Sequence, residues 1–203
     1  MSGKLGDIYK TKLLLGEGVD EVRFFQGLLK YLNITDVQVE AYEGKDKLGN
    51  YLKTLPLRPG YRELISLGIT RDADKSTNNA FDSICGFLKN AKLPIPSKTK
   101  ETVGDKLKVS VLIIPDYQNS GMLEDVCLEA VKSDPIISCI DDYFKCISYT
   151  VGQDTKEIAK ARLKVWLASQ IKPDMRLGEA AQAGYFPWNS SAFDGLKQFL
   201  ESL

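Results

Sequence analysis

The chain has 203 residues, 43% of them hydrophobic and 27% charged, as in an ordinary globular protein. Its 27 Lys and Arg residues balance 27 Asp and Glu residues, so net charge favours no nucleic-acid partner and leaves open only a local basic face. The sequence contains no histidine, which excludes Ser-His-Asp and Cys-His catalysis, histidine-ligated zinc and a histidine general base.

Targeting signals and cysteine spacing indicate the compartment. No segment approaches the roughly 18–20 apolar residues of a membrane span, and the N-terminal residues MSGKLGDIYKTK contain no apolar signal region. The four cysteines, Cys85, Cys127, Cys139 and Cys146, show no C-x-x-C pair and lie among apolar residues. We therefore expect a cytoplasmic protein, not associated with a membrane, with buried and reduced thiols.

The first half of the chain is predicted to alternate strands and helices. Apolar runs favour strands, and spacing such as that of Val22, Phe25 and Leu29 favours a helix. A polar stretch at 94–105 is predicted to be a loop. In chain order the expected elements are a strand at 10–18, a helix at 19–34, a strand at 36–44, a short helix at 45–56, a strand at about 62–70, a helix at 76–94 and a strand at 106–116.

This alternation predicts an α/β fold with a mostly parallel sheet of about four strands flanked by helices. Right-handed crossovers place every strand-to-helix loop at one edge of the sheet, where open α/β folds bind ligands. After Asp116 the pattern becomes helical. We expect one domain over 1–203, with an α/β core at about 1–120 and a helical C-terminal extension at about 121–203.

Acidic residues occur at the C-terminal ends of all four expected strands. They are Glu17 at the end of the first strand, Glu43 and Asp46 at the end of the second, Asp72 and Asp74 at the end of the third, and Asp116 at the end of the fourth, with Glu124 and Asp125 at the next helix start. Clustered carboxylates repel one another unless a cation neutralises them, and oxygen ligands without His or Cys are typical of Mg²⁺ or Mn²⁺. In an extended segment Asp72 and Asp74 point to the same side and can reach one ion.

Each acid also has a simpler interpretation. Asp72 and Asp74 suit a turn and a helix N-cap, Glu17 suits a cap of the following helix, and Glu124 and Asp125 suit any helix first turn. A single D-x-D is a weak signal by itself. The joint arrangement at one edge favours a metal site.

Basic residues near this edge suggest how a substrate would be held. Gly44 and Lys45 are predicted to open a helix, whose N-terminus with a nearby lysine suits a phosphate. Lys160 or Arg162, on the long helix expected at 154–173, is a candidate to stabilise charge in a transition state. A solvent-exposed helix face is the simpler interpretation of the latter two residues.

The stretches LLLGEG and GITRDAD resemble the Toprim domain of topoisomerases, primases and related nucleases. That family has a Glu at the end of the first strand and a D-x-D after the third, so the resemblance implies that Glu17, Asp72 and Asp74 form its acidic triad. GMLEDVCL resembles the Toprim domain of OLD-family nucleases, where further acids and a later Lys complete a two-metal site. Nearly the full length is similar to a family of small stand-alone Toprim-like proteins of unknown function.

The resemblance implies a Mg²⁺- or Mn²⁺-dependent phosphodiester hydrolase acting on DNA or RNA. The expected residues are Glu17, Asp72, Asp74 and Lys160 for catalysis, the same three acids with Glu124 and Asp125 for metal, and Gly44 and Lys45 for phosphate. The chain lacks a topoisomerase tyrosine domain, a zinc ribbon and a G-x-x-x-x-G-K-[ST] motif. The alternatives are a non-catalytic module that binds nucleic acid, a nucleotide, a protein partner or a second copy of itself, and a hydrolase of small phosphoesters.

Overall fold

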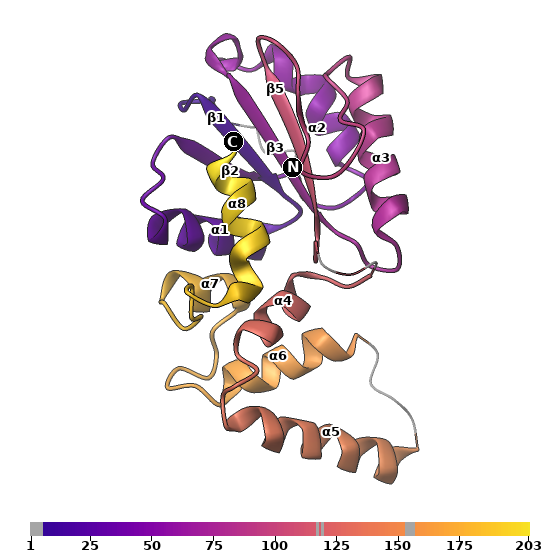
Figure 1. Ribbon diagram of the computed structural model, residues 1–203, viewed down its shortest axis with the longest axis vertical. Helices are drawn as coiled ribbons and strands as arrows, with labels where there is room; N and C mark the ends of the chain where they lie inside the picture. Colours follow the sequence, from indigo (N-terminus) through magenta and orange to yellow (C-terminus); the bar gives the residue numbers. More distant parts are fainter. Residues whose placement is uncertain (1–5, 117, 119, 153–156) are drawn as a thin grey trace.

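The computed structural model describes residues 6–116, 118, 120–152 and 157–203, and its centre is a five-stranded sheet (Figure 1). The strands are β1 Lys12–Gly16, β2 Val37–Ala41, β3 Ser66–Asp72, β4 Thr102–Val103 and β5 Lys108–Ile114, in the order β2-β1-β3-β5-β4. All neighbours pair in parallel except β4 with β5. The mostly parallel α/β fold is confirmed. The predicted loop at 94–105 was wrong in part, because Thr102–Val103 adds an antiparallel edge strand.

The helices follow the predicted alternation. They are α1 Val19–Tyr31, α2 Leu48–Thr54, α3 Thr77–Asn90, α4 Leu123–Ala130, α5 Ile136–Val151, α6 Ile158–Ala168, α7 Leu177–Gln182 and α8 Asp194–Glu201, with 3-10 turns at Leu55–Leu57, Tyr61–Glu63 and Ser191–Phe193. The turn at Tyr61–Glu63 occupies the expected start of the third strand. That strand is therefore shifted along the chain and extends to Asp72.

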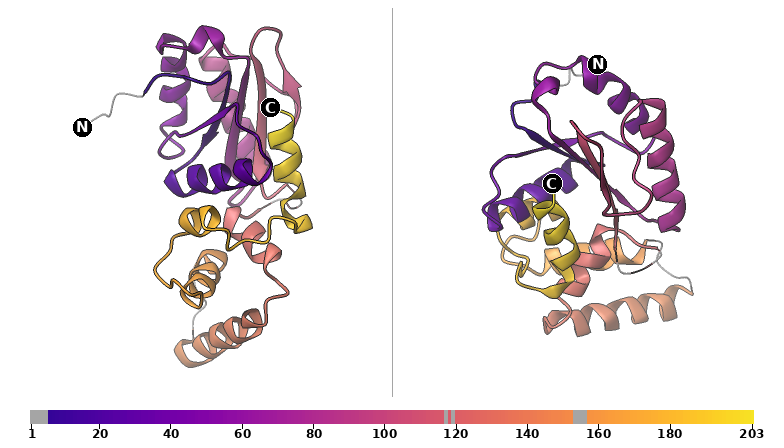
Figure 2. Two further views of the ribbon diagram at one scale, coloured as in Figure 1. Left: turned by 90° about the vertical axis from the view of Figure 1, so that its left-hand side faces the viewer. Right: turned by 45° about the horizontal axis from the view of Figure 1, so that its top comes forward.

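Both faces of the sheet are covered, which explains the continuous apolar strands. Side chains alternate along β1, so Leu13 and Leu15 face the cluster under α2 and α3, whereas Leu14 faces the cluster under α1 and α8. Figures 1 and 2 show α2 and α3 on one side of the sheet and α1 and α8 on the other. Every residue of β1 from Leu13 to Gly16 is buried.

The helices after Gly121 share a hydrophobic core with the sheet. Leu163 and Trp166 of α6, and Phe199 of α8, belong to the same buried cluster as Leu14 of β1. The C-terminal Leu203 contacts the sheet at Gly68, where an added Cβ would lie 2.7 Å from its side chain. The C-terminal extension is therefore helical, as predicted, and it completes the core on one face of the sheet.

Helix α5 is the least buried element of the extension. Only Ile140 of its 16 residues is buried. Cys139 and Cys146, on this helix, are exposed, and Cys85 is half-buried, so the prediction of four buried thiols was wrong for all but Cys127. The thiols are free, as predicted.

No helix in the part of the chain that the structure describes is long and apolar enough to cross a membrane.

A buried ion pair fixes the segment before β1 to the edge of the sheet. The Arg58 guanidinium donates to both carboxylate oxygens of Glu40, at 2.7 and 2.8 Å, and to the carbonyl oxygen of Gly6. Tyr51 also donates its hydroxyl to Glu40. Burial opposes ionisation of Glu40, but the hydrogen bonds from Arg58 and Tyr51 outweigh it and lower the pKa of this carboxyl.

We predict that Arg58→Met lowers the free energy of unfolding by about 3–5 kcal/mol, because it leaves the Glu40 carboxylate buried without its ionic partner. Urea unfolding followed by circular dichroism measures the effect. The control is Arg62→Met, which removes an exposed arginine from the neighbouring 3-10 turn. An equal decrease in the free energy of unfolding of the two variants would show that the ion pair of Arg58 with Glu40 contributes no more to stability than an exposed arginine does.

Candidate functional site

Parallel pairing brings two of the predicted acids to one edge of the sheet. Strands β1 and β3 are neighbours in parallel register, with Leu15 opposite Ile69. Glu17 follows the last residue of β1, and Asp72 is the last residue of β3. Both side chains therefore lie where the carboxyl ends of the strands meet, as the topology of an open parallel sheet requires.

Backbone hydrogen bonds attach the start of α4 to the same edge. Asp74 and Gly121 exchange two backbone hydrogen bonds of 2.8 Å, forming an isolated antiparallel bridge. The Asp72 carboxylate accepts a hydrogen bond of 3.0 Å from the backbone N–H of Leu123, in the first turn of α4. These contacts bring Glu124 close enough for its charge to act on Asp72.

Three of these carboxyls resist ionisation. Burial is the main cause in each case: it raises the pKa of Glu17 and Glu124, and raises that of Asp72 well above its ordinary value. Neighbouring carboxylates add to the effect, since Glu124 acts on Asp72 and Asp74 acts on Glu17. We call Glu17, Asp72 and Glu124, together with Glu21, the acidic edge.

Glu21 is a member of the acidic edge that the sequence analysis missed. Its charge raises the pKa of Glu17, Asp72 and Glu124, so it lies within electrostatic reach of all three. Its carboxylate accepts a hydrogen bond of 2.9 Å from the backbone N–H of Gly18 and thereby caps α1. Its position one helical turn after Glu17 is the signal that would have identified it.

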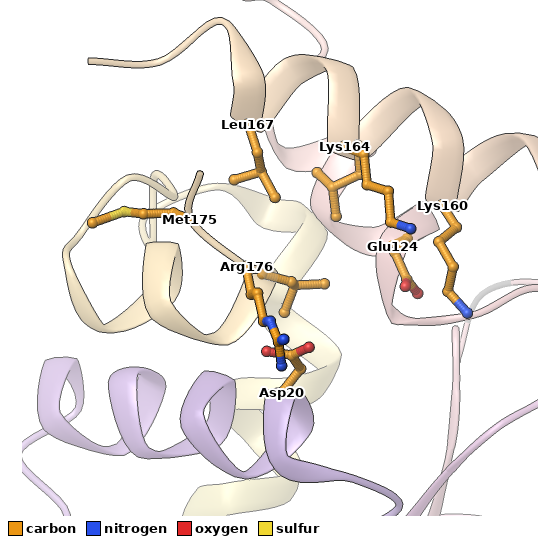
Figure 3. A pocket seen from close by; sticks show the side chains of 9 residues that line it. Asp20, Glu124, Lys160, Lys164, Leu167, Met175 and Arg176 are labelled. Carbon is orange, nitrogen blue, oxygen red and sulfur yellow. The ribbon is translucent and has the colours of Figure 1, made fainter. Parts of the chain in front are cut away.

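Two of the predicted cations lie beside these acids. Lys45 forms an ion pair with Asp74, and its charge partly offsets the raised pKa of Glu17. The Nζ atom of Lys160 lies 3.6 Å from a carboxylate oxygen of Glu157. Burial lowers the pKa of Lys160, but nearby carboxylates outweigh burial and raise this pKa, and Glu124 contributes most among them. Figure 3 shows the Lys160 ammonium next to the Glu124 carboxylate.

The structure turns Arg162, the alternative to Lys160, away from the acidic edge. Arg162 forms an ion pair with Asp141 of α5 and lines a cavity between α5 and α6. Lys160 and Arg162 are two residues apart on a helix, so they point in different directions. Lys160 is the one that faces Glu124.

Other predicted residues have local partners. The Asp125 carboxylate accepts a hydrogen bond of 2.8 Å from the backbone N–H of Met122, and this bond caps α4. Glu43 pairs with Lys47 at 3.3 Å, and Asp116 pairs with Lys100 at 2.7 Å. Glu43 and Asp116 thus each form an ion pair with a lysine and do not join the acidic edge.

Gly44 and Lys45 do not open a helix, contrary to the prediction. They lie in a turn, Gly44 has φ +107°, and α2 begins only at Leu48. The backbone N–H of Gly44 donates to the carbonyl oxygen of Glu17 at 3.1 Å. This contact holds the turn against the end of β1, which explains how Lys45 reaches the edge without a helix N-terminus.

Two cavities flank the acidic edge. The first, of about 450 Å³, lies between α4, α6 and the start of α7 and includes Glu124 and Lys160; we call it the α4–α6 cavity (Figure 3). The second, of about 420 Å³, lies beside Asp74; we call it the Lys45 cavity. Besides Lys45 and Asp74, the Lys45 cavity is lined by Arg71, Lys75, Ser76 and Asn79.

Comparison with known proteins identifies the family of this chain and supports its fold. Residues 11–203 match the model of a family described as a protein of unknown function (DUF3226). The chain belongs to this family. Among curated protein sequences, none matches.

The solved structures to which this chain is similar are C-terminal regions of OLD proteins. Two structures of the C-terminal region of the Xanthomonas campestris pv. campestris OLD protein, phased with iodine and with platinum, have a TM-score of 0.50 at 13% and 11% identity. Each match covers 96% of this chain and 96% or 93% of the OLD chain. The C-terminal region of the Burkholderia pseudomallei OLD protein gives a TM-score of 0.48 at 12% identity, covering 96% of this chain and 98% of its own. The DUF3226 chain thus shares its α/β fold with the C-terminal region of the Xanthomonas campestris pv. campestris OLD protein.

The raised pKa values of the acidic edge predict a dependence of stability on pH. A carboxyl whose pKa is higher in the folded than in the unfolded state, where it is about 4, keeps its proton better when folded. The free energy of unfolding should therefore fall as the pH rises from about 4 through the raised values.

We predict that Asp72→Asn raises the free energy of unfolding at pH 7 in EDTA by about 1 kcal/mol, because a buried carboxyl is costly at this pH whether it keeps its proton or ionises. The amide avoids this cost and keeps an acceptor for the N–H of Leu123. Thermal unfolding at pH 4 and pH 7 tests this, and the gain should shrink at pH 4. Glu63→Gln, an exposed carboxylate outside the acidic edge, is the control. A loss of stability in Asp72→Asn at both pH values would contradict the prediction.

Proposed function

We propose that this DUF3226 protein is a Mg²⁺- or Mn²⁺-dependent hydrolase of phosphodiester bonds in DNA or RNA, with the acidic edge as its centre. One observation carries the proposal: Glu17, whose buried Oε2 has no hydrogen-bond partner in the described structure, shares an edge with Asp72 and Glu124, and burial raises the pKa of all three. A protein gains no stability from gathering carboxylates without a cation, so their placement supports a functional reason.

The donor set fits a hard divalent cation. The unpaired oxygen of Glu17 and the carboxylates of Asp72 and Glu124 are hard oxygen ligands with no His or Cys among them. Within residues 6–116, 118, 120–152 and 157–203, no three such groups already converge on one point. Binding would therefore draw these side chains together, and Asp74 would join them by leaving Lys45. The resemblance of the sequence to the Toprim family supports the same set, because it implies that Glu17, Asp72 and Asp74 correspond to that family's acidic triad.

The protein's own groups have distinct roles in this proposal. Glu17, whose buried Oε2 has no partner in the described structure, would act with Asp72 as a ligand of the ion that organises the reaction. Lys160, beside Glu124, would stabilise negative charge on the reacting phosphate, and Lys45 would bind a neighbouring phosphate. Bound divalent ions would supply a nucleophile and charge neutralisation at the phosphate oxygens.

A non-catalytic binding module is the second candidate, and a specific observation favours it. Several acids already have partners within the chain: Asp74 has Lys45, Asp72 has the N–H of Leu123, and Asp125 caps α4. On this alternative the same basic and acidic groups would bind nucleic acid, a nucleotide or a protein partner, and no bond would be broken.

We predict that Mg²⁺ or Mn²⁺ raises the melting temperature of the parent protein, because a ligand that binds only the folded state stabilises it by about 2.7 kcal/mol at a hundredfold excess over its Kd. Glu17→Gln/Asp72→Asn should lose this rise, whereas Glu63→Gln should keep it. Differential scanning calorimetry with and without the ion measures the shift. The same rise in parent and double variant would place the ion elsewhere.

We predict that the protein cleaves DNA or RNA in Mg²⁺ or Mn²⁺ and that Asp72→Asn lowers the rate about a hundredfold or more, as does Glu17→Gln. Labelled single-stranded and double-stranded DNA and RNA, resolved on gels over time, provide the assay. Glu63→Gln should cleave like the parent. If the parent and Asp72→Asn cleaved at the same background rate, the proposed hydrolase activity would be excluded and the non-catalytic binding module would be favoured.

A further inference from the structure

The α4–α6 cavity adjoins the proposed reaction centre through shared residues. Glu124 belongs to both the acidic edge and the wall of this cavity, and Lys160 lines it as well (Figure 3). Its volume of about 450 Å³ is within the usual range for pockets that bind small molecules. A molecule held there would therefore lie directly beside a phosphate at the acidic edge.

One side of the cavity is apolar and fixed. Leu163 and Leu167 of α6 and Leu177 at the start of α7 are buried and belong to the core, and half-buried Met175 adjoins them. These side chains form a wall that does not depend on a ligand for its shape. Leucine and methionine side chains suit the flat face of a heterocyclic ring, and methionine adapts to its outline.

The rim of the cavity is cationic. Lys164 and Arg176, both exposed, join Lys160 there, and Figure 3 shows Lys164 and Lys160 side by side on α6. Among the described residues, neither Lys164 nor Arg176 forms a side-chain ion pair within 4.0 Å, although the charge of Arg176 acts on Glu179 and helps to lower its pKa. Both side chains are therefore free to form a direct contact with an anion. Two acids also line the cavity, and Figure 3 shows Asp20 beside Arg176 and Glu124 beside Lys160; their carboxylates provide acceptors for N–H groups.

This combination identifies the class of ligand. A bare phosphate needs no apolar wall, and an uncharged ring needs no cluster of cations. A nucleotide has both parts, since its base offers a flat face and N–H donors and its phosphate carries the charge. The apolar side chains of Leu167 and Met175 suit the base, and the cations Lys164 and Arg176 suit the phosphate.

We propose that the α4–α6 cavity is a nucleotide subsite, which holds an unpaired nucleotide and so presents the neighbouring phosphodiester to the acidic edge. The position of that phosphodiester rests on the proposed function, whereas binding of the nucleotide does not. An unpaired nucleotide of a strand and a free nucleotide share this chemistry, and the probes below separate them.

Isothermal titration in EDTA, where no cleavage takes place, tests the subsite directly. The probes are adenosine 5′-monophosphate, ribose 5-phosphate, which lacks the base, and a short oligodeoxyadenylate. We expect ribose 5-phosphate to bind about tenfold or more weakly than adenosine monophosphate, because it cannot use the apolar wall. The double variant Lys164→Ala/Arg176→Ala should bind adenosine monophosphate about tenfold or more weakly than the parent. Lys172→Ala, which changes an exposed lysine outside the cavity, should bind it like the parent.

Several outcomes would overturn the subsite: no binding of adenosine monophosphate, equal binding of both monophosphates, or equal affinity in parent and double variant at equal melting temperatures. Tighter binding of the oligonucleotide supports an unpaired strand as the source, and tighter binding of the mononucleotide supports a free nucleotide. The variant Asp72→Asn separates the two proposals. If it and the parent both bind adenosine monophosphate but neither cleaves nucleic acid in Mg²⁺, the subsite stands and the hydrolase fails.

Discussion

The parallel pairing of β3 with both β1 and β5 is the constraint on which the rest of the structure depends. It places the carboxyl ends of three strands at one edge, so Glu17 and Asp72 meet although 54 residues separate them along the chain. The bridge between Asp74 and Gly121 then attaches α4 to that edge and adds Glu124. A change that shifted the register of β3 by one residue would turn Asp72 to the other face of the sheet and separate its carboxylate from Glu17 and Glu124.

The carboxyls of the acidic edge lie where ionisation is unfavourable. Burial and mutual repulsion raise the pKa of its carboxyls, whereas neighbouring cations and backbone N–H groups relieve only part of the cost. Lys45 is paired with Asp74, and Lys160 acts on Glu124, yet Oε2 of Glu17 remains buried without a partner in the described structure. The hydrophobic core on both faces of the sheet supplies the stability that offsets this unfavourable free energy. A divalent cation bound at the acidic edge would neutralise the carboxylates and so reduce it.

The mostly parallel sheet and the meeting of the strand ends could be predicted, because apolar runs indicate the strands and the rule for parallel crossovers places their following loops at one edge. The strand order was not predicted, since nothing in the local sequence specifies which strands are neighbours. Glu17 and Asp72 followed from that rule. Glu21 did not, because a carboxylate in the first turn of a helix is expected as a cap in any protein, and it does cap α1. The same ambiguity affects Asp125, whose carboxylate caps α4. Arg162 differs from Lys160 only in its direction on α6, and that direction depends on how α5 packs, which local sequence does not encode.

The central claim is that Glu17 and Asp72 bind one divalent cation at the acidic edge. Anomalous diffraction from crystals grown with Mn²⁺ tests it most directly, since manganese can be located independently of any assay. The account predicts a manganese peak about 2.0–2.6 Å from carboxylate oxygens of both residues. Saturating Mn²⁺ with no peak at this edge, or with peaks only at other carboxylates, would contradict it.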